Sequence, residues 1–288
     1  MGIKIFDTVG GVKEALAAAR AGGQTVGFVP TMGALHAGHI SLIERSAAEN
    51  GCTAVSIFVN PLQFGEGEDL EKYPQTLDAD IRACENAGAE MVFVPRAAEL
   101  YPAGFSTYVD MTGLTDALCG RARPRHFRGV MTVVTKLFNI IRPDRAYFGE
   151  KDAQQLVIIR KLARDLDMGV EVIGCPTVRE ADGLAMSSRN IYLSPDERKA
   201  ATCLYRALLR AAELAEEHFD DNTDVGGIIS EVRAIIEAEP LARLEYAELV
   251  DAELLTPVTK TSRAALLAIA AHIGGTRLID AITLRWPQ

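Results

Sequence analysis

Two histidines three residues apart, His36 and His39, have the type and the spacing that phosphate chemistry uses. Residues 26–29 before them form an apolar run that predicts a buried strand, ended by Pro30 because proline has no N–H for a ladder. Apolar residues recur at helical spacing from His39 onward, so a helix is expected from there to about Asn50. A helix start presents unpaired backbone N–H groups and the positive end of the helix dipole to an anion. The histidines would add two donors for a phosphorus transition state, or they serve only as caps of the helix.

Polar side chains also follow the ends of two other predicted strands. Asn60 and Gln63 come after the apolar run 53–59, and Lys151 comes after residues 145–148. In open parallel sheets, ligands bind at the carboxyl ends of the strands. A lysine at that place meets phosphate as a point charge, and the two amides offer neutral hydrogen bonds. The alternative for the amides is a turn in which they only face solvent.

Two further loops carry groups that hold phosphates. Ser187 and Ser188 stand beside Arg189 after the predicted sheet, and such groups can bind a triphosphate by charge-assisted bonds. The alternative is a polar loop whose hydroxyls cap their own backbone. The stretch 120–129 is the densest basic segment of the chain and includes Arg123. It is interpreted as an arginine loop for phosphate or carboxylate, as a small RNA contact, or as a solvated charged loop.

These side chains need elements that bring the strand ends together. Strands alternate with helices in the first part of the chain, and the strands are continuously apolar, which is typical of a parallel sheet covered by helices. Further strands are expected at 91–94 and 170–174, and residues 3–6 are interpreted as a short edge segment. Right-handed crossovers then place the strand-end loops on one edge, and Gly33 and Gly38 are expected to give the first loop its tight turns. The sequence thus predicts an α/β domain over residues 1–176.

The remaining residues, 177–288, predict a smaller α+β domain. Ser194 begins a capping box, and the helix after it is expected to run to about residue 217. The acidic run 220–224 is interpreted as a solvent-facing linker because it lacks the spaced ligands of a calcium loop. Candidate strands lie at 244–250, 264–271 and 277–283.

Composition narrows the class of protein. The chain has 288 residues, 48% of them hydrophobic, and a net charge of −9, so nucleic acid and anionic membranes are not expected as main partners. No apolar run is long enough to span a bilayer, and no signal peptide is recognised. The five cysteines are scattered and show no disulfide framework or zinc pattern, so a reducing, cytoplasmic location is expected.

Five sequence blocks together resemble one family. They are P-T-M-G-A-L-H-A-G-H at 30–39, S-I-F-V-N-P-L-Q-F at 56–64, R-P-R-H-F-R-G at 123–129, F-G-E-K-D-A-Q-Q at 148–155 and D-G-L-A-M-S-S-R-N at 182–190. Their order resembles the nucleotidyltransferases with H-I-G-H and K-M-S-K-S signatures. Within that superfamily the blocks resemble the pantothenate synthetases, which are pantoate–β-alanine ligases. Leu62 departs from the methionine expected there, an apolar exchange of similar volume.

The resemblance implies a Rossmann-like domain that binds ATP and pantoate, a smaller C-terminal lid domain, and a cytoplasmic homodimer. ATP and pantoate would give pantoyl adenylate and pyrophosphate, β-alanine would then release AMP, and Mg²⁺ would accompany ATP. The implied catalytic residues are His39 as proton donor, His36, Lys151 and Arg189. The implied ATP-binding residues are Met32, Gly33, Ala34, Leu35, His36, Ala37, Gly38, His39, Gly149, Glu150, Lys151, Asp152, Val178, Met186, Ser187, Ser188 and Arg189. The residues expected to bind pantoate or β-alanine are Gln63, Gln155, Asn60 and Arg123.

Two other functions are weighed against this one. The first is another adenylating enzyme of the superfamily, such as an aminoacyl-tRNA synthetase core, which the acidic chain and the lack of an anticodon-binding region disfavour. The second is a module that only senses ATP, although paired histidines and two phosphate loops exceed what binding requires. The metal ligands are unassigned, with Asp78 and Asp80 considered only because they are acidic and near the loops.

Overall fold

The computed structural model describes residues 2–218, 225–259, 262 and 264–285. The predicted acidic linker at 220–224 lies outside these residues. Contacts divide the chain into two compact units. The first unit takes residues 1–116, 120–149 and 158–175, and the second takes 117–119, 150–157 and 176–288.

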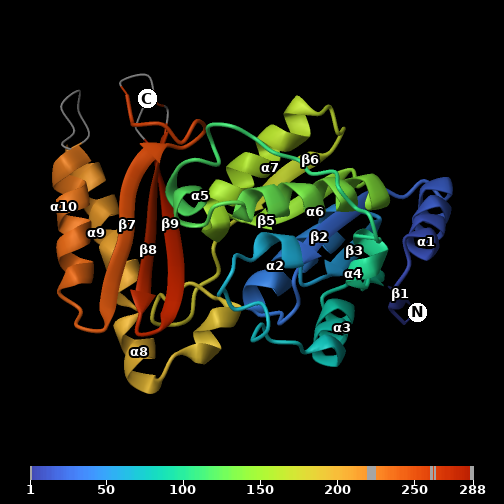
Figure 1. Cartoon of the computed structure of the whole chain (residues 1–288), viewed down its shortest axis with the longest axis horizontal. Helices are drawn as coiled ribbons and strands as arrows, with labels where there is room; N and C mark the ends of the chain where they lie inside the picture. Colours follow the sequence, from blue (N-terminus) through green and yellow to red (C-terminus); the bar gives the residue numbers. More distant parts are fainter. Residues whose placement is uncertain (1, 219–224, 260–261, 263, 286–288) are drawn as a thin grey trace. The chain divides into compact units, whose positions relative to one another are not determined.

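The first unit is built on a six-stranded parallel sheet, as the alternating pattern predicts (Figure 1). Its strand order is β1-β4-β3-β2-β5-β6. The strands are β1 (Lys4–Phe6), β2 (Val26–Thr31), β3 (Cys52–Ile57), β4 (Met91–Phe93), β5 (Arg145–Gly149) and β6 (Glu171–Cys175). The helices of this part of the chain are α1 (Val9–Ala21), α2 (Ala37–Glu49), α3 (Leu77–Asn86), α4 (Ala97–Leu100), α6 (His126–Ile141) and α7 (Ala153–Asp165). The predicted α/β class is confirmed.

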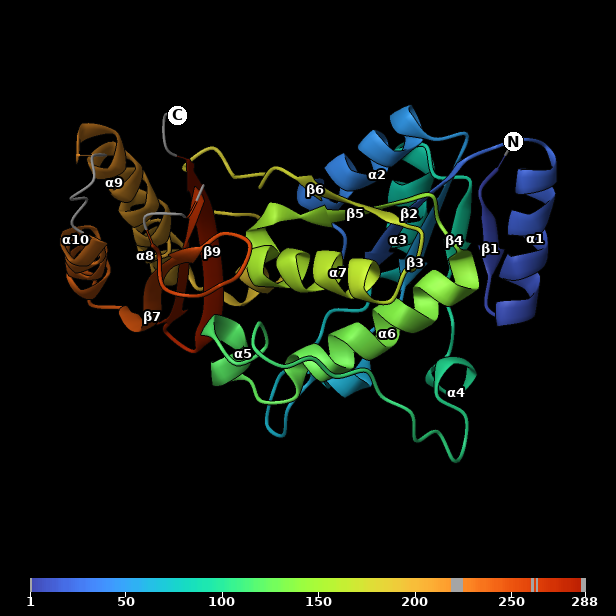
Figure 2. The same cartoon turned by 90° about the horizontal axis from the view of Figure 1, so that it is seen from above.

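Helices cover both faces of this sheet because successive residues of a buried strand point to opposite sides. On β2, Phe28 packs edge-on against Phe138 of α6, whereas the next residue, Val29, joins the cluster formed with Ile43 of α2 and Cys84 of α3. Figure 2 shows α2 and α6 on opposite sides of the sheet. Burial on both faces explains why these strands are continuously apolar rather than alternating.

The predicted end of the first long strand at Pro30 is wrong. β2 continues to Thr31, and Pro30 lies opposite Ser56 of β3. The pairing of β2 with β5 ends at Phe28. On that side of the strand, therefore, no hydrogen bond is lost because Pro30 lacks an N–H. The strand therefore delivers the following loop two residues later than expected.

The second unit contains an antiparallel sheet of three strands, β7 (Ala242–Asp251), β8 (Ala264–Ile273) and β9 (Thr276–Arg285). Its helices are α8 (Pro195–Ala200), α9 (Cys203–His218) and α10 (Val225–Glu237). One hydrophobic cluster joins α9 and α10 to the sheet, including Leu204, Val232 and Leu267. The three predicted strands are confirmed, each slightly longer than expected.

The single helix predicted from Ser194 to residue 217 is two helices. Its capping box is present, with Ser194 and Glu197 bonded reciprocally. The hydroxyl of Thr202 donates to the carbonyl of Lys199 at 2.8 Å, and the Thr202 N–H bonds the same carbonyl at 3.2 Å. These bonds tighten the chain between α8 and α9, as threonine does when it competes for backbone acceptors.

One further short helix, α5 (Leu118–Ala122), lies between α4 and α6. All five cysteines are buried, and none forms a disulfide with another described residue. None of the helices in the part of the chain that the structure describes has the length and apolarity needed to cross a membrane.

Candidate active site

The loop after β2 is held from behind by Asp80. The backbone turns at Gly33, with φ of +83°, and at Ala34, with φ of +50°. The N–H groups of Ala34 and Leu35 donate to the Asp80 carboxylate at 3.0 and 2.8 Å, and Asp80 is only 3% exposed. Asp80 therefore anchors this loop. Asp78 lies exposed in the first turn of α3.

The two histidines form the N-terminal cap of α2, which begins at Ala37 rather than at His39. His36 is the N-cap, and its Nδ1 accepts the N–H of Gly38 at 3.1 Å. Nδ1 of His39 accepts the N–H of His36 at 3.3 Å, and the ring centroids are 4.0 Å apart. The predicted tight turn at Gly38 is wrong, because Gly38 is already helical.

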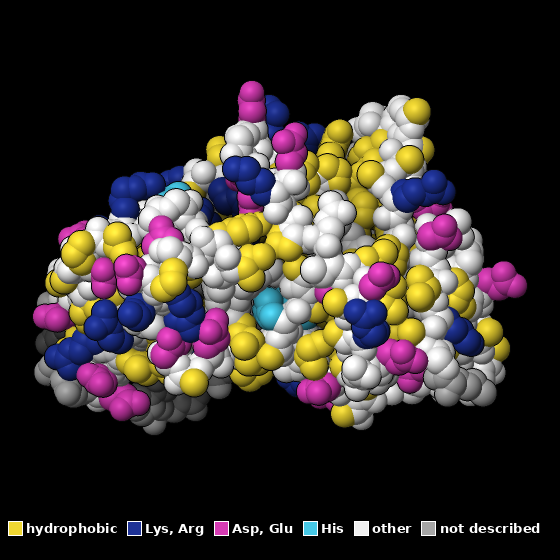
Figure 3. All heavy atoms as spheres, turned by 90° about the horizontal axis from the view of Figure 1, so that it is seen from below, with side chains coloured by type: hydrophobic (Ala, Val, Ile, Leu, Met, Phe, Trp, Pro, Cys, Tyr) yellow, Lys and Arg dark blue, Asp and Glu magenta, His cyan; other side chains and the backbone are white. Residues whose placement is uncertain are grey.

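This capping decides where the imidazole protons lie. In a neutral ring whose Nδ1 accepts a hydrogen bond, the proton sits on Nε2. Both rings are half-buried. On the face drawn in Figure 3, some histidine side chains (cyan) reach the molecular surface. The sequence left two roles open for these histidines, namely capping the helix and donating to a phosphate. The two roles are compatible, because a neutral ring that caps through Nδ1 still has Nε2–H as a donor.

Gln63 follows β3 in a single turn of 3₁₀ helix, η1 (Pro61–Gln63). Its Oε1 accepts from Nδ2 of Asn60 at 3.0 Å, and its Nε2 lies 3.1 Å from the sulfur of Met32. The ends of β2 and β3 thus bring Met32 and Gln63 together, as the strand-end argument predicts.

Asn60 is buried, with 1% of its surface exposed. Its amide nitrogen also donates to the Gly129 carbonyl at 3.1 Å, and its oxygen accepts the hydroxyl of Tyr101 at 2.8 Å. Burial raises the pKa of Tyr101, so this hydroxyl keeps its proton. These contacts hold Asn60 beside Gln63, and its substrate contact stays a prediction.

Arg123 is likewise engaged within the first unit. Its guanidinium pairs with Glu68, with Nε 2.8 Å from Oε1, and also reaches the Gln63 carbonyl at 3.3 Å. Nδ1 of His126 lies 2.8 Å from the same carbonyl. Burial alone would raise the pKa of Glu68, but the hydrogen bonds and charge of Arg123 outweigh it and lower the pKa. Arg123 holds the loop of Gln63, and its contact with substrate stays a prediction.

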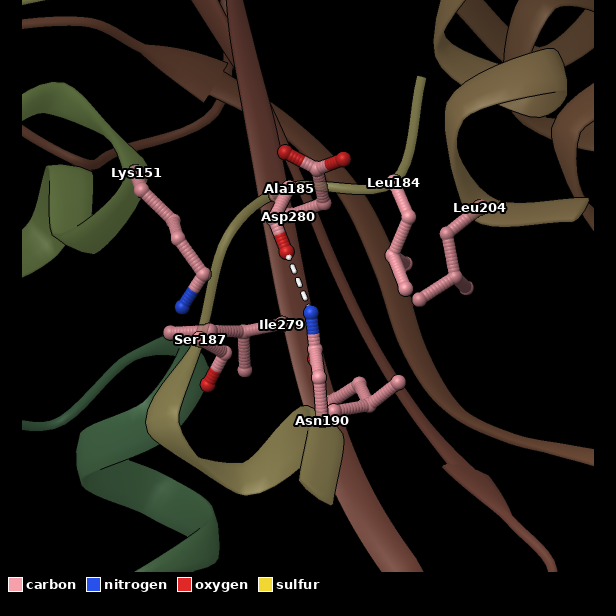
Figure 4. A pocket seen from close by; sticks show the side chains of 9 residues that line it. Lys151, Leu184, Ala185, Ser187, Asn190, Leu204, Ile279 and Asp280 are labelled. Atoms are coloured by element: carbon pink, nitrogen blue, oxygen red, sulfur yellow. Dashed lines mark hydrogen bonds between the residues drawn. The ribbon is translucent and has the colours of Figure 1, made fainter. Parts of the chain in front are cut away.

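Lys151 belongs to the second unit. It lies in η2 (Glu150–Asp152), directly between β5 and α7, as predicted. Within the described ranges no hydrogen bond or ion pair of Lys151 is found. Lys151 and Ser187 line one small pocket together with Asn190 and Asp280 (Figure 4). Gln155 lies half-buried one turn into α7.

The loop with the M-S-S-R motif is part of a hairpin. The N–H of Met186 donates to the Val178 carbonyl at 3.0 Å, and Arg179 bridges to Ala185. Ser187 caps the short helix η3 (Ser188–Tyr192) by accepting the Arg189 N–H at 3.3 Å. Self-capping, one alternative from the sequence, is therefore present at Ser187.

The predicted residues thus form two sets. The first unit holds the histidine cap, Met32 and Gln63 close to the ends of β2 and β3. The second holds Lys151 and Ser187 around one pocket. Sequence reasoning missed Asp80 as an anchor, and also Glu68 and His126 around Arg123. Among these only His126 carried a signal, as part of the basic block.

Comparisons with known proteins agree with one another. The model of the family described as pantoate-beta-alanine ligase matches residues 4–283. A pantothenate synthetase of Heliobacterium modesticaldum is 55% identical over 258 residues, which is 90% of this chain and 91% of that one. The crystal structure of pantothenate synthetase from Thermus thermophilus is 45% identical, with a TM-score of 0.91, and covers 97% of this chain and 99% of its own.

A third relative carries ligands. It is the pantoate-beta-alanine ligase from Francisella tularensis, complexed with beta-gamma ATP and beta-alanine. It is 33% identical, has a TM-score of 0.79, and covers 98% of this chain and 97% of its own. A family match over nearly the whole length, with identities of about half, places this chain in the pantoate–β-alanine ligase family.

Proposed function

We propose that this chain is an ATP-dependent ligase that joins pantoate to β-alanine through a pantoyl adenylate. The pantoate carboxylate attacks the α-phosphorus of ATP, and pyrophosphate leaves. The β-alanine amine then attacks the acyl carbon, and AMP leaves with pantothenate as product. The observation that carries the proposal is the pair of imidazoles oriented by the N-terminus of α2, in a chain of this family.

The first step makes an electrostatic demand. A carboxylate is already ionised, so no general base is required, and charge builds on phosphate oxygens and on the leaving pyrophosphate. His39 supplies a proton or hydrogen-bond donor at that place, and His36 supplies a second donor. The loop 32–39, from Met32 to His39, leads into α2 and places the positive end of the helix dipole beside the two imidazoles.

The phosphates are assigned to the second set of residues. Lys151 supplies an ammonium that pairs with no other described residue, Ser187 and Ser188 supply hydroxyls, and Arg189 supplies a guanidinium. Met186 belongs to the same loop. The remaining nucleotide contacts proposed are Gly149, Glu150, Asp152 and the main chain at Val178. Both sets would serve one adenylation reaction.

Gln63 and Gln155 are proposed to bind the hydroxyls and carboxylate of pantoate, with Gln63 also serving β-alanine. An amide is suited to this because it donates and accepts without adding charge. Asn60 and Arg123 are assigned to the support of Gln63, on the contacts described above.

We propose that ATP binds together with Mg²⁺. This ion takes oxygen ligands from one or two carboxylates and from phosphates. Glu150 and Asp152 are exposed on either side of Lys151 and offer such oxygens. Acyl adenylates hydrolyse readily, so water must be excluded. We assign that exclusion to the domain 177–288 acting as a lid, and propose that the enzyme works as a cytoplasmic homodimer.

Isotope transfer tests the adenylate route. Pantoate labelled with ¹⁸O in its carboxylate is incubated with ATP, Mg²⁺ and β-alanine, and the AMP is analysed by mass spectrometry. One labelled oxygen is expected in AMP for each pantothenate formed. Formation of ADP, or AMP without label, would overturn the adenylate route.

A further inference from the structure

Arg179 and Asp280 form a buried ion pair beside the phosphate loop. Both terminal guanidinium nitrogens reach the carboxylate, Nη1 at 2.6 Å and Nη2 at 3.0 Å. The Asp280 side chain is only 1% exposed. Arg179 also donates to the Gly183 carbonyl at 3.0 Å and stacks 4.1 Å above the ring of Tyr205. Buried charges persist only when they are paired, so each side chain fixes the other.

Asp280 also lines the pocket of Lys151. Both residues surround this one space, together with Ser187 and Asn190. In Figure 4 the Asp280 carboxylate is turned away from Lys151, whose ammonium points toward Ser187. An unpaired carboxylate in this pocket would attract the ammonium strongly, because the local dielectric is low.

The loop itself has a second, independent support. Arg198 bonds Asp182 at 2.7 Å and also pairs with Glu180. Asn190 donates to Glu180 at 3.0 Å and to the Ala185 carbonyl at 3.2 Å. These contacts tie both arms of the hairpin together without Arg179.

We propose that Arg179 is a positioning residue for adenylation: by pairing with Asp280 it withholds that carboxylate from Lys151 and leaves the ammonium for phosphate. The inference rests on the proposed function and adds Arg179 and Asp280, which lie outside the five sequence blocks. Because the separate Arg198 network holds the loop, the decisive feature is the charge of Asp280 and not the shape of Arg179.

Substitution and rescue test this directly. Arg179→Met keeps a long side chain over Tyr205 but exposes Lys151 to an unpaired Asp280. Pantoate-dependent exchange of pyrophosphate into ATP should fall roughly 10- to 100-fold, the scale of one lost charge-assisted bond. Adding Asp280→Asn should restore the rate to within about threefold of the original protein, because the competing charge is gone.

The second half-reaction is the internal control. Aminolysis of supplied pantoyl adenylate by β-alanine needs no triphosphate, so it should change less than about threefold in Arg179→Met. Arg277→Met is the matched variant: Arg277 makes a similar bidentate pair with Glu245, at 2.8 and 2.9 Å, and neither residue lines the Lys151 pocket. It should leave the exchange rate nearly unchanged.

Failure to regain exchange in the double variant would overturn the inference, as would an equal fall of both half-reactions in Arg179→Met. Failure of the proposed function has a different signature, namely no pantoate-dependent exchange in the unaltered protein. Equilibrium dialysis with ATP then still tests the pair, since the affinity should fall in Arg179→Met and recover in the double variant.

Discussion

His36 and His39 bond to the same helix start, each accepting a backbone N–H at Nδ1, with ring centroids 4.0 Å apart. The first turn of α2 thereby loses two unpaired donors, and each neutral ring keeps its proton on Nε2. Stability and chemistry are thus joined in one motif, and a suitable substitution can separate them.

His39→Ala should lower turnover by roughly two or more orders of magnitude, the scale of one lost transition-state donor. It should also cost about 1 kcal/mol of unfolding free energy, because the capping box is broken. Steady-state kinetics and urea unfolding measure the two effects. Near-normal turnover would leave His39 with the capping role alone.

His36→Asn separates the two roles at the neighbouring position. Asparagine is among the best N-cap residues, so the unfolding free energy should change by less than about 0.5 kcal/mol. The rate of adenylation should still fall by roughly tenfold or more, because the imidazole donor is lost. A rate equal to that of the original protein would remove His36 from the chemistry.

Part of this architecture was predictable and part was not. Apolar runs identified the inner strands β2, β3 and β4, because burial on both faces leaves an unbroken signal. The edge strands β1 and β6 gave a weaker pattern, since both have exposed positions. Pro30 misled the prediction, since the cost of its missing N–H depends on which sides of the strand are paired at that residue, and the local sequence does not show this. The break at Thr202 was not predictable either: its hydroxyl donates to the Lys199 carbonyl between α8 and α9. Thr132 makes a comparable bond to the Arg128 carbonyl inside the unbroken helix α6.

In the candidate site, too, some features could be predicted and others could not. His36, Gln63 and Lys151 were found because strand ends and helix starts have local signatures. The pairing of Arg123 with Glu68, 55 residues away in the sequence, could not be predicted because no local pattern links the two residues. The anchoring role of Asp80 could not be predicted either, because the sequence does not show that its carboxylate accepts the N–H groups of Ala34 and Leu35.

Asn60 and Gln63 should respond differently to truncation. Asn60→Ala leaves the buried hydroxyl of Tyr101 and the Gly129 carbonyl without their partner, so it should cost about 1–3 kcal/mol of unfolding free energy. Gln63→Ala should change stability by less than about 1 kcal/mol while raising the KM for pantoate. Thermal unfolding and kinetics at varied pantoate compare the pair. A large stability loss only in the Gln63 variant would reverse the two assignments.

Glu68 should contribute a pH-dependent part of stability. Its pKa lies below its usual value of 4.5, because hydrogen bonds from Arg123, with lesser help from the Gly65 N–H and His126, outweigh burial. A carboxyl with a lowered folded pKa stabilises the fold above its unfolded pKa and loses that effect as pH falls through the folded pKa. Glu68→Gln should therefore narrow the stability difference between pH 6 and pH 3, since one source of it is removed. Urea unfolding at both pH values measures this, and an unchanged difference would contradict it.

Lys151→Met should leave the unfolding free energy within about 0.5 kcal/mol, because the described structure gives this ammonium no partner to lose. The KM for ATP should rise and adenylation should slow by roughly 10- to 100-fold. Lys151→Arg keeps the charge in a larger, planar shape and should recover only part of the rate. Unaltered kinetics in the methionine variant would exclude Lys151 from phosphate binding.

The most direct test of the account is exchange of labelled pyrophosphate into ATP by the unaltered protein. With Mg²⁺ and pantoate present and β-alanine absent, label should enter ATP, because adenylation is reversible before any amine is needed. Exchange that requires an amino acid in place of pantoate, or no exchange with either acid, would contradict the central claim.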